Sequence, residues 1–302
     1  MRKVVVRGFF SRKLRAVLTG LAIALGVCLM AGTYVLTDTI DRSFANIFDT
    51  ATKGIDVAVT PHKAIKNASD SSLPPIPEST LERVKQVPGV KLAAGTIFGQ
   101  GAILDARGKR VGSGGGPTFV ASVDPVQFEA FKAGDGRLPR REGEVALDAS
   151  TAKNKHVGIG DGISIVGRGP AQRFRVVGLV KFGGSESFGA SAALLTLPDA
   201  QRVTGEAGAF DEIDVAADTG VTPEALRDRV RAVLPRELDV RTGQQQADKQ
   251  TSDIHDQLGF LRTFLLVFAG IALLVATFSI NNTFSIIAAQ RQRTAALLRA
   301  VG

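Results

Sequence analysis

The sequence has few of the residues that build covalent cross-links or metal sites. Of its 302 residues, one is cysteine (Cys28) and three are histidine (His62, His156 and His255). A single cysteine cannot form an intramolecular disulfide bond, so a folded domain must be stable through its core alone. The histidines are far apart in the sequence, and none has the nearby histidine or cysteine that local zinc motifs use. We therefore expect no metal site and no cofactor.

Catalytic motifs are also missing. The glycines at 112–116 are followed by proline rather than by the Lys-Ser or Lys-Thr and helix of a phosphate-binding loop. A Gly-x-Ser-x-Gly nucleophile motif is absent. Glu142, Glu144 and Asp148 are close together, but apolar residues alternate with them as in a strand, which predicts that these acids face solvent. The sequence therefore predicts a protein that is not an enzyme.

Acidic residues are absent from both ends of the chain. Two long stretches, residues 16–37 and 263–290, contain no Asp, Glu, Lys or Arg. The residues that flank them at the termini include nine basic ones: Arg2, Lys3, Arg7, Arg12, Lys13, Arg15, Arg291, Arg293 and Arg299. The formal net charge of +8 therefore belongs to the flanks, and residues 38–262 carry a net charge of −1. This distribution argues against nucleic-acid binding, which needs cations spread over a folded face.

The charge-free stretches are instead typical of membrane spans. A transmembrane helix needs about 20 mainly apolar residues, so we expect one at 16–37 and another at 263–289. Lysine and arginine gather on the cytoplasmic side. The basic segment 1–15 and the C-terminal segment 290–302 should therefore be cytoplasmic, and the residues between the spans extracytoplasmic. The protein is then a multi-pass protein of the cell membrane.

The first apolar stretch has two other interpretations. It could be a cleaved signal peptide, but it is longer than the usual apolar core of 7–15 residues and lacks a clear small-x-small site. It could be a lipoprotein signal, because Cys28 follows Leu-Gly-Val, although valine fits poorly before a lipidated cysteine. We favour an uncleaved anchor, in which Cys28 is a small packing residue.

Helical periodicity continues beyond both spans. Apolar residues recur at three- and four-residue steps through 38–52, including Phe44 and Phe48, and through 246–262, including Ile254 and Leu258. We expect two antiparallel stalk helices with these four side chains in the seam between them. Two surface helices of a globular domain are the alternative.

The extracytoplasmic region, residues 53–245, alternates strand and helix patterns. "IDVAVTP", "PESTLERVKQVPGV" and "VKLAAGTIFGQGAILD" predict one βαβ unit, and "DEIDVAAD", "TPEALRDRVRAVLP" and "ELDVRTG" predict another. Between them, residues 122–205 consist of short strand patterns separated by Gly, Pro and Asp-Gly turns. The expected fold class is an α+β membrane protein with two stalk-extended spans, a split βαβ subdomain and an inserted strand-rich subdomain.

Several segments together resemble a known family. They are "RGFFSRKLRAVLTGLAIALGV", "GTYVLTDTI", "GEVALDASTAKNKHVGIGDGISI", "RFRVVGLV" and "NNTFSIIAAQRQRTAALLRAVG". This combination resembles the FtsX-like, MacB-type permease subunits of ABC transporters, in particular the long two-repeat members of high-GC Gram-positive bacteria. The commoner family form has glutamate at the position of Ala295, so one acidic contact expected from the family is absent.

The resemblance implies partners and a mechanism. A separate cytoplasmic ABC ATPase should bind the segment after the second span and move the helices, which carry this movement to the outer domain for export or extraction of a substrate. Candidate docking residues are Arg291, Arg293, Leu297, Leu298, Arg299 and Val301. Family members have further spans, so the chain is expected to be an N-terminal piece or truncated product that needs those spans or a second permease copy besides the lipid bilayer.

Other functions remain open. A two-span sensor would have a ligand-binding outer domain and a cytoplasmic output domain. An anchored extracytoplasmic binding or scaffold domain would have no ATPase partner. The three C-terminal arginines could also be a membrane anchor without a docking role, because such residues are common behind spans.

Overall fold

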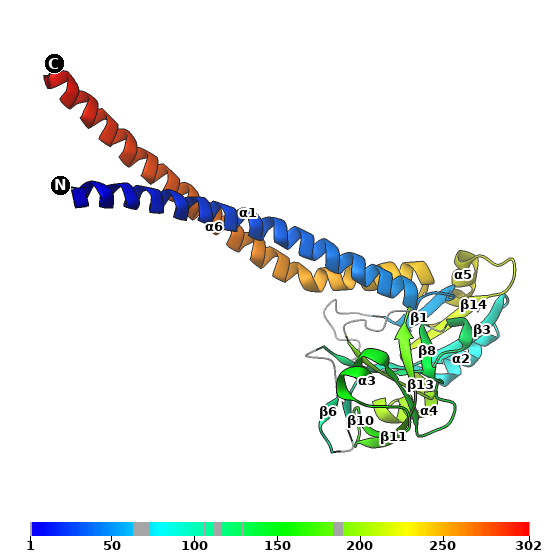
Figure 1. Ribbon diagram of the computed structural model, residues 1–302. Coiled ribbons are helices and arrows are strands. Elements are labelled where there is room, and N and C mark those ends of the chain that lie inside the picture. The colour runs from blue at the N-terminus through cyan, green and yellow to red at the C-terminus, as the bar shows by residue number, and fades with distance from the viewer. Residues whose placement is uncertain are drawn as a thin grey trace. The chain divides into compact units, whose positions relative to one another are not determined.

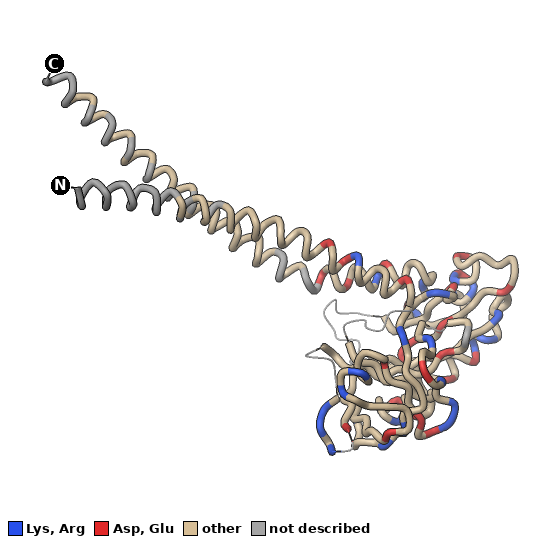
Figure 2. The backbone as a smooth tube through the Cα atoms, in the orientation of Figure 1, with Lys and Arg blue, Asp and Glu red and all other residues tan. Residues whose placement is uncertain are grey.

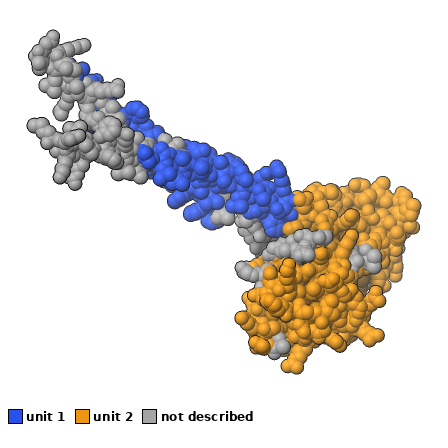
Figure 3. All heavy atoms as spheres, viewed as in Figure 1, with its two compact units in different colours: residues 1–44, 251–302 blue, residues 45–250 orange. Residues whose placement is uncertain are grey.

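The computed structural model describes residues 2–62, 73–105, 107–111, 116–128, 130–183 and 190–301, and it omits some helical side chains, including those of residues 2–16 and 297–301. The chain forms two compact units, which Figure 3 colours separately. Unit 1 consists of residues 1–44 and 251–302, and unit 2 of residues 45–250. The two units are taken separately below.

Two long helices provide all of unit 1. Helix α1 runs from Arg2 to Ala51 and helix α6 from Gly243 to Val301 (Figure 1). Each predicted span and its stalk therefore belong to one uninterrupted helix. Neither helix contains proline, which would remove a backbone donor and displace the preceding turn. Both helices also contribute residues to unit 2, because α1 ends at Ala51 and α6 begins at Gly243.

Helix α6 begins three residues before the predicted start at 246. The reason is a reciprocal cap: Gln245 N donates to Thr242 Oγ1 (3.2 Å), and Thr242 N donates to Gln245 Oε1 (3.1 Å). These two bonds satisfy backbone donors that the first helical turn would leave free. Glycine is required at position 243, because a Cβ there would collide with the carbonyl oxygen of Ile55.

The first sheet of unit 2 interlocks the two predicted βαβ units. Its strand order is β15-β1-β14-β3, and all neighbours are antiparallel. The strands are β1 (Val57–Pro61), β3 (Val90–Thr96), β14 (Glu212–Ala217) and β15 (Leu238–Thr242). Strands β1 and β3, from the first unit, lie on either side of β14 from the second. This arrangement is a split βαβ fold and confirms that part of the prediction.

Helices α2 (Glu78–Lys85) and α5 (Pro223–Val233) pack on one face of this sheet. Their Val84 and Leu226 are fully buried in one core with Val57, Ile213 and Val215 of the strands. Helix α5 begins where the sequence predicts, because Thr222 Oγ1 accepts a hydrogen bond from Ala225 N (3.3 Å) and Pro223 occupies the first turn. Two further strands, β2 (Ile76–Pro77) and β13 (Ala209–Phe210), pair with each other in a short antiparallel ladder. In the sequence, β2 directly precedes α2 and β13 precedes β14.

The inserted subdomain is built on a second, nine-stranded sheet. Its main order is β4-β7-β12-β9-β11-β10-β5-β6, and β8 pairs with β11. The strands are β4 (Phe98–Gln100), β5 (Ala102–Leu104), β6 (Arg110–Val111), β7 (Thr118–Ser122), β8 (Phe131–Gly136), β9 (Glu144–Asp148), β10 (Gly162–Val166), β11 (Gln172–Phe182) and β12 (Ser191–Leu195). A 3-10 turn, η2 (Val126–Phe128), follows β7.

Both faces of this sheet are covered near its centre. On one face, helices α3 (Ala149–Lys155) and α4 (Leu197–Thr204) share a core with Leu147, Ile165 and Val176. On the other face, Ala146, Val180 and Leu194 are buried under Phe131 and Leu138. Strand β12 is consequently buried along its whole length, as its uninterrupted apolar pattern requires.

The inserted sheet begins well before the predicted boundary at 122. Strands β4, β5 and β6 belong to it, because β4 pairs with β7 and β5 pairs with β10. Ile103 therefore lies opposite Ile165, more than sixty residues away in the sequence. Local periodicity indicates strands in this region but does not show which sheet they join.

Candidate functional site

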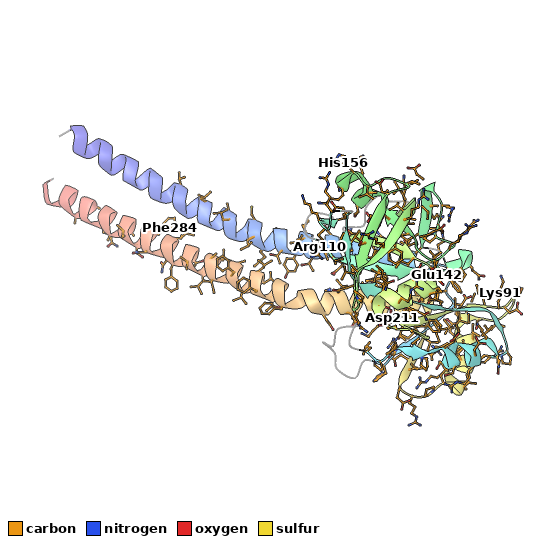
Figure 4. The ribbon with its side chains drawn as sticks, turned by 90° about the horizontal axis from the view of Figure 1, so that it is seen from below. Lys91, Arg110, Glu142, His156, Asp211 and Phe284 are labelled. Atoms are coloured by element: carbon orange, nitrogen blue, oxygen red, sulfur yellow. The ribbon has the colours of Figure 1, made fainter. Side chains whose placement is uncertain are left out.

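The two helices of unit 1 are an antiparallel pair. A Cβ built on Gly26 would lie 3.8 Å from the backbone nitrogen of Leu273, and His255 Nδ1 lies 3.1 Å from Asp41 Oδ2. From the first contact to the second, the residue number rises by 15 along α1 and falls by 18 along α6, so the helices run in opposite directions. At the usual helical rise these lengths are roughly 22 and 27 Å. Figures 1 and 4 both show the helices side by side along this length.

Small residues make the close approach possible. Of the side chains described in unit 1, the buried ones include Ala269, which is 1% exposed, and Thr33, which is 4% exposed, and Gly26 is buried with them. The Thr33 hydroxyl donates to the carbonyl of Leu29 (2.7 Å) within its own helix. Small side chains at an interface let two helix backbones pack closely inside a membrane.

Substituting Gly26 should therefore have a size-dependent effect on the helix pair. Gly26→Ala is expected to be tolerated, because the added carbon would meet Leu273 at ordinary van der Waals distance. Gly26→Leu should force the helices apart. Oxidative cross-linking of cysteines introduced at Asp41 and His255, in a Cys28→Ser background, measures the pairing. Equal cross-linking in wild type, alanine and leucine variants would contradict the close contact.

The segment Thr263–Ile286 of α6 is long and apolar enough to cross a membrane, by length and composition. Its large side chains are mostly exposed, among them Phe268 and Phe284, which is labelled in Figure 4 and is 67% exposed. In the first predicted span, 16–37, the structure describes only some of the side chains. Two of these, Leu25 and Val35, are exposed. In Figure 2 the described middle of the helix pair is free of Lys, Arg, Asp and Glu, which agrees with the absence of these residues from 16–37 and 263–290 in the sequence.

The residues predicted for the stalk seam are only partly described. Phe44 and Ile254 belong to unit 1 and are half-buried, and Phe48 is half-buried in unit 2. The side chain of Leu258 lies outside the described residues. The seam therefore stays a prediction.

The predicted docking residues lie on the last three turns of α6. The segment 290–301 continues this helix without a break. The side chains of the candidates lie outside the described residues: Arg291, Arg293, Leu297, Leu298, Arg299 and Val301. The helical backbone is compatible with a docking role and with a simple anchor.

The three histidines have structural roles that do not involve one another. His62 Nδ1 lies 3.0 Å from Asp239 Oδ1, and His255 contacts Asp41 across the helix pair. His156 ends α3 in the left-handed conformation with a φ of 55°. The described residues contain no group of three or more His, Cys, Asp or Glu that could hold a metal ion. Sequence reasoning missed the His255 contact, whose partner is 214 residues away.

The predicted exposure of the acids around β9 is wrong for Asp148. This carboxylate is 2% exposed and accepts hydrogen bonds from Ser150 Oγ (2.6 Å), Thr151 N (2.9 Å) and Ala192 N (2.9 Å). It is buried because β9 lies in the middle of a sheet covered on both faces, and it begins α3 as the N-cap.

Glu142 and Glu144 remain nearer the surface, each held by arginine. Glu142 Oε2 accepts from Arg202 Nη1 (2.8 Å). Arg137 donates to Glu144, and the backbone nitrogens of Arg140 and Arg141 do so too, which lowers the pKa of Glu144 to about 2. An acid fixed in its ionised form by several donors is unsuited to proton transfer near neutral pH. Residues 112–115, most of the glycine cluster, lie outside the described residues.

Comparison with known proteins identifies the family. Residues 16–233 match the family described as the MacB-like periplasmic core domain. Comparison with curated proteins gives no match. Among solved structures, the periplasmic region of MacB from Actinobacillus actinomycetemcomitans is similar, with 13% identity, a TM-score of 0.48 and coverage of 66% of this chain and 94% of that one.

Two other solved structures are similar at a comparable level. The extracellular domain of the noncanonic ABC-type transporter YknZ from Gram-positive bacteria has 12% identity, a TM-score of 0.40 and coverage of 62% of this chain and 98% of that one. A domain of a permease protein from Porphyromonas gingivalis has 16% identity, a TM-score of 0.43 and coverage of 64% and 90%. Because the family match extends over well more than half of its residues, this chain belongs to the MacB-like permeases of ABC transporters, membrane proteins with a mixed α/β extracytoplasmic domain.

Proposed function

We propose that the protein is the membrane subunit of an ABC transporter complex and transmits movement of a separate cytoplasmic ATPase to its extracytoplasmic domain. The movement would serve export or extraction of a substrate, and ATP hydrolysis would belong to the partner. Permeases of this family are generally non-catalytic and work with such an ATPase. The acids around β9 are held by fixed hydrogen-bond partners, which suits structural roles for them.

The observation that best supports this proposal is the continuity of α1 and α6. They contain 50 and 59 residues, and each contributes to both units. At 1.5 Å per residue, a helix of this length spans roughly 75–90 Å. An unbroken hydrogen-bond ladder can carry a displacement along that distance, whereas a loop would absorb it. We further propose that Phe44, Phe48, Ile254 and Leu258 hold the stalk segments together.

The proposed topology puts both termini in the cytoplasm and residues 38–262 outside, because the terminal flanks carry nine positive charges and no negative one. Cysteine labelling tests it. In a Cys28→Ser background, a cysteine replacing Ser113 should react in intact cells with a membrane-impermeant maleimide, and one replacing Arg12 should react only after the cells are opened. The reverse pattern would rule the topology out.

The proposed partner is tested by purification of the intact protein from its native membrane. Mass spectrometry should find an ABC ATPase bound in near-stoichiometric amount, and the complex should hydrolyse ATP. A second permease copy or further spans would appear in the same experiment. A bound signalling protein without ATPase would support the sensor alternative, and a complex with extracytoplasmic proteins alone would support the scaffold alternative.

A further inference from the structure

The chain crosses between the two sheets of unit 2 at two places that lie against each other. The first crossing runs from Thr96 of β3 to Phe98 of β4, and the second from the end of α4 to Asp211. Asp211 N donates to the carbonyl of Thr96 (3.0 Å), and Phe98 N donates to Asp211 Oδ2 (2.8 Å). Figure 4 shows Asp211 at the boundary between the sheets. Any movement of one sheet relative to the other must deform this junction.

Two carboxyl groups meet at the second crossing. Glu206 is 8% exposed, and its Oε1 accepts from Arg168 Nη1 (3.1 Å). Its Oε2 is buried and has no donor among the residues that the structure describes. Burial, and then the neighbouring Asp211, raise the pKa of Glu206 to about 7. A protonated Glu206 can donate its hydrogen to Asp211, which gives the otherwise unsatisfied oxygen a partner.

A second buried carboxyl group lies on the sheet beside the first crossing. Asp214 of β14 alternates with Ile213 and Val215, which face the helices, so it points to the opposite face. It is 5% exposed, and Thr96 Oγ1 donates to its Oδ2 (3.3 Å). Its Oδ1 is buried without a donor in the described part of the chain. This pattern is expected of a carboxyl group that carries a proton.

The surroundings of Asp214 favour the same protonated state. Burial, then Glu212 on its own strand and Asp124 from the inserted subdomain, raise the pKa of Asp214 well above its ordinary value, against the Thr96 hydrogen bond. The next charged pair on this sheet face belongs to β15, two strands away: Arg241 Nη2 donates to Asp239 Oδ2 (2.6 Å). Arg168 brings a positive charge to the junction, where its Nη1 lies 3.1 Å from Glu206 Oε1.

We propose that Asp124, Glu206, Asp211, Glu212 and Asp214 form a proton-dependent clasp between the two subdomains of unit 2. When protonated, Glu206 can donate to Asp211, the residue that holds the two crossings together through Thr96 and Phe98, and Asp214 can lie uncharged beside Thr96. When ionised, they repel the neighbouring acids and loosen the junction. The clasp is independent of the proposed ATPase coupling, and in an extracytoplasmic domain it would respond to the pH outside the cell.

The direction of the pH effect follows from the raised pKa of Glu206. The closed junction binds this proton more tightly than an open or unfolded one does, so closure is most stable below the ordinary glutamate pKa and is lost as the pH rises through about 7. The same sign applies to Asp214, whose pKa is also raised. Between pH 6 and pH 9, a shift of this size changes the opening equilibrium by about tenfold.

Hydrogen exchange of the full-length protein in lipid nanodiscs tests the clasp. After correction for the intrinsic pH dependence of exchange, protection of residues 94–100 and 204–214 should fall about tenfold from pH 6 to pH 9. Glu206→Gln keeps a donor toward Asp211 without a titratable proton and should largely remove this fall, and Asp214→Asn should reduce it. Glu142→Gln, at a surface carboxylate that pairs with Arg202, is the matched control and should behave as wild type.

Three results would overturn the proposal. One is wild-type protection of these segments that does not change between pH 6 and pH 9, which needs no variant and so does not depend on the substituted chains folding. The second is an unchanged pH response in both Glu206→Gln and Asp214→Asn. A pH response spread equally over β9, β11 and the junction would likewise contradict a local clasp, because it would indicate a general loss of stability.

Discussion

Replacing Leu297 with Glu and Leu298 with Ser is expected to abolish co-purification of the ATPase and ATP-dependent activity while leaving membrane insertion intact. If the end of α6 docks onto the partner, these two leucines provide its apolar surface. Burying a new carboxylate in such a contact carries a large desolvation cost, and losing two leucines removes roughly 3 kcal/mol or more of favourable burial. Affinity purification followed by immunoblotting and ATPase assay measures the loss.

The alternative of a simple anchor makes the opposite prediction. An anchor depends on the charges of Arg291, Arg293 and Arg299 and is indifferent to the leucines. Changing the three arginines to lysine is the matched control, because it keeps the charge and should preserve insertion. If the leucine variant retains both the ATPase and the activity, the docking proposal is wrong and the sensor and scaffold alternatives gain support.

Asp148→Ala is expected to destabilise the extracytoplasmic domain by about 3 kcal/mol. The substitution removes three hydrogen bonds, and it leaves the backbone N–H of Ala192 without its acceptor between two covered sheet faces. A buried donor that loses its partner costs more than the bond itself contributes, and the N-cap of α3 is lost as well. Differential scanning calorimetry of the purified protein should show a lower unfolding temperature for this domain.

Two comparisons make the Asp148 prediction specific. In Asp148→Asn the side-chain oxygen can still accept from Thr151 N, but the amide nitrogen then faces Ala192 N, and both of these groups are donors. The expected loss of stability is therefore intermediate. Asp228→Ala removes an exposed carboxylate that pairs with its neighbour Arg227, and its effect should stay within about 0.5 kcal/mol. Equal stabilities for Asp148→Ala and Asp228→Ala would show that the buried carboxylate is unimportant.

Features that depend on neighbouring residues could be predicted from the sequence. The charge-free stretch at 263–289 predicts a membrane span because length and composition alone decide solvation in lipid, and the helical segment Thr263–Ile286 meets both requirements. The span at 16–37 stays a prediction. The two βαβ units were predictable because Thr222 and Pro223 mark a helix start, and alternating apolar residues mark the strands. The family was also recognisable from short segments, and the match over residues 16–233 confirms it.

Features that depend on pairing between distant residues were decided by the tertiary structure. Strands β4 to β6 join the inserted sheet through β7 and β10, and Asp148 is buried because β9 lies between covered faces. The contacts of Asp41 with His255 and of Asp211 with Phe98 likewise have no local signal. From the sequence alone, each carboxyl group is expected to be exposed and to have its ordinary pKa. Its burial, its partners and therefore its proton are determined only when remote segments fold around it.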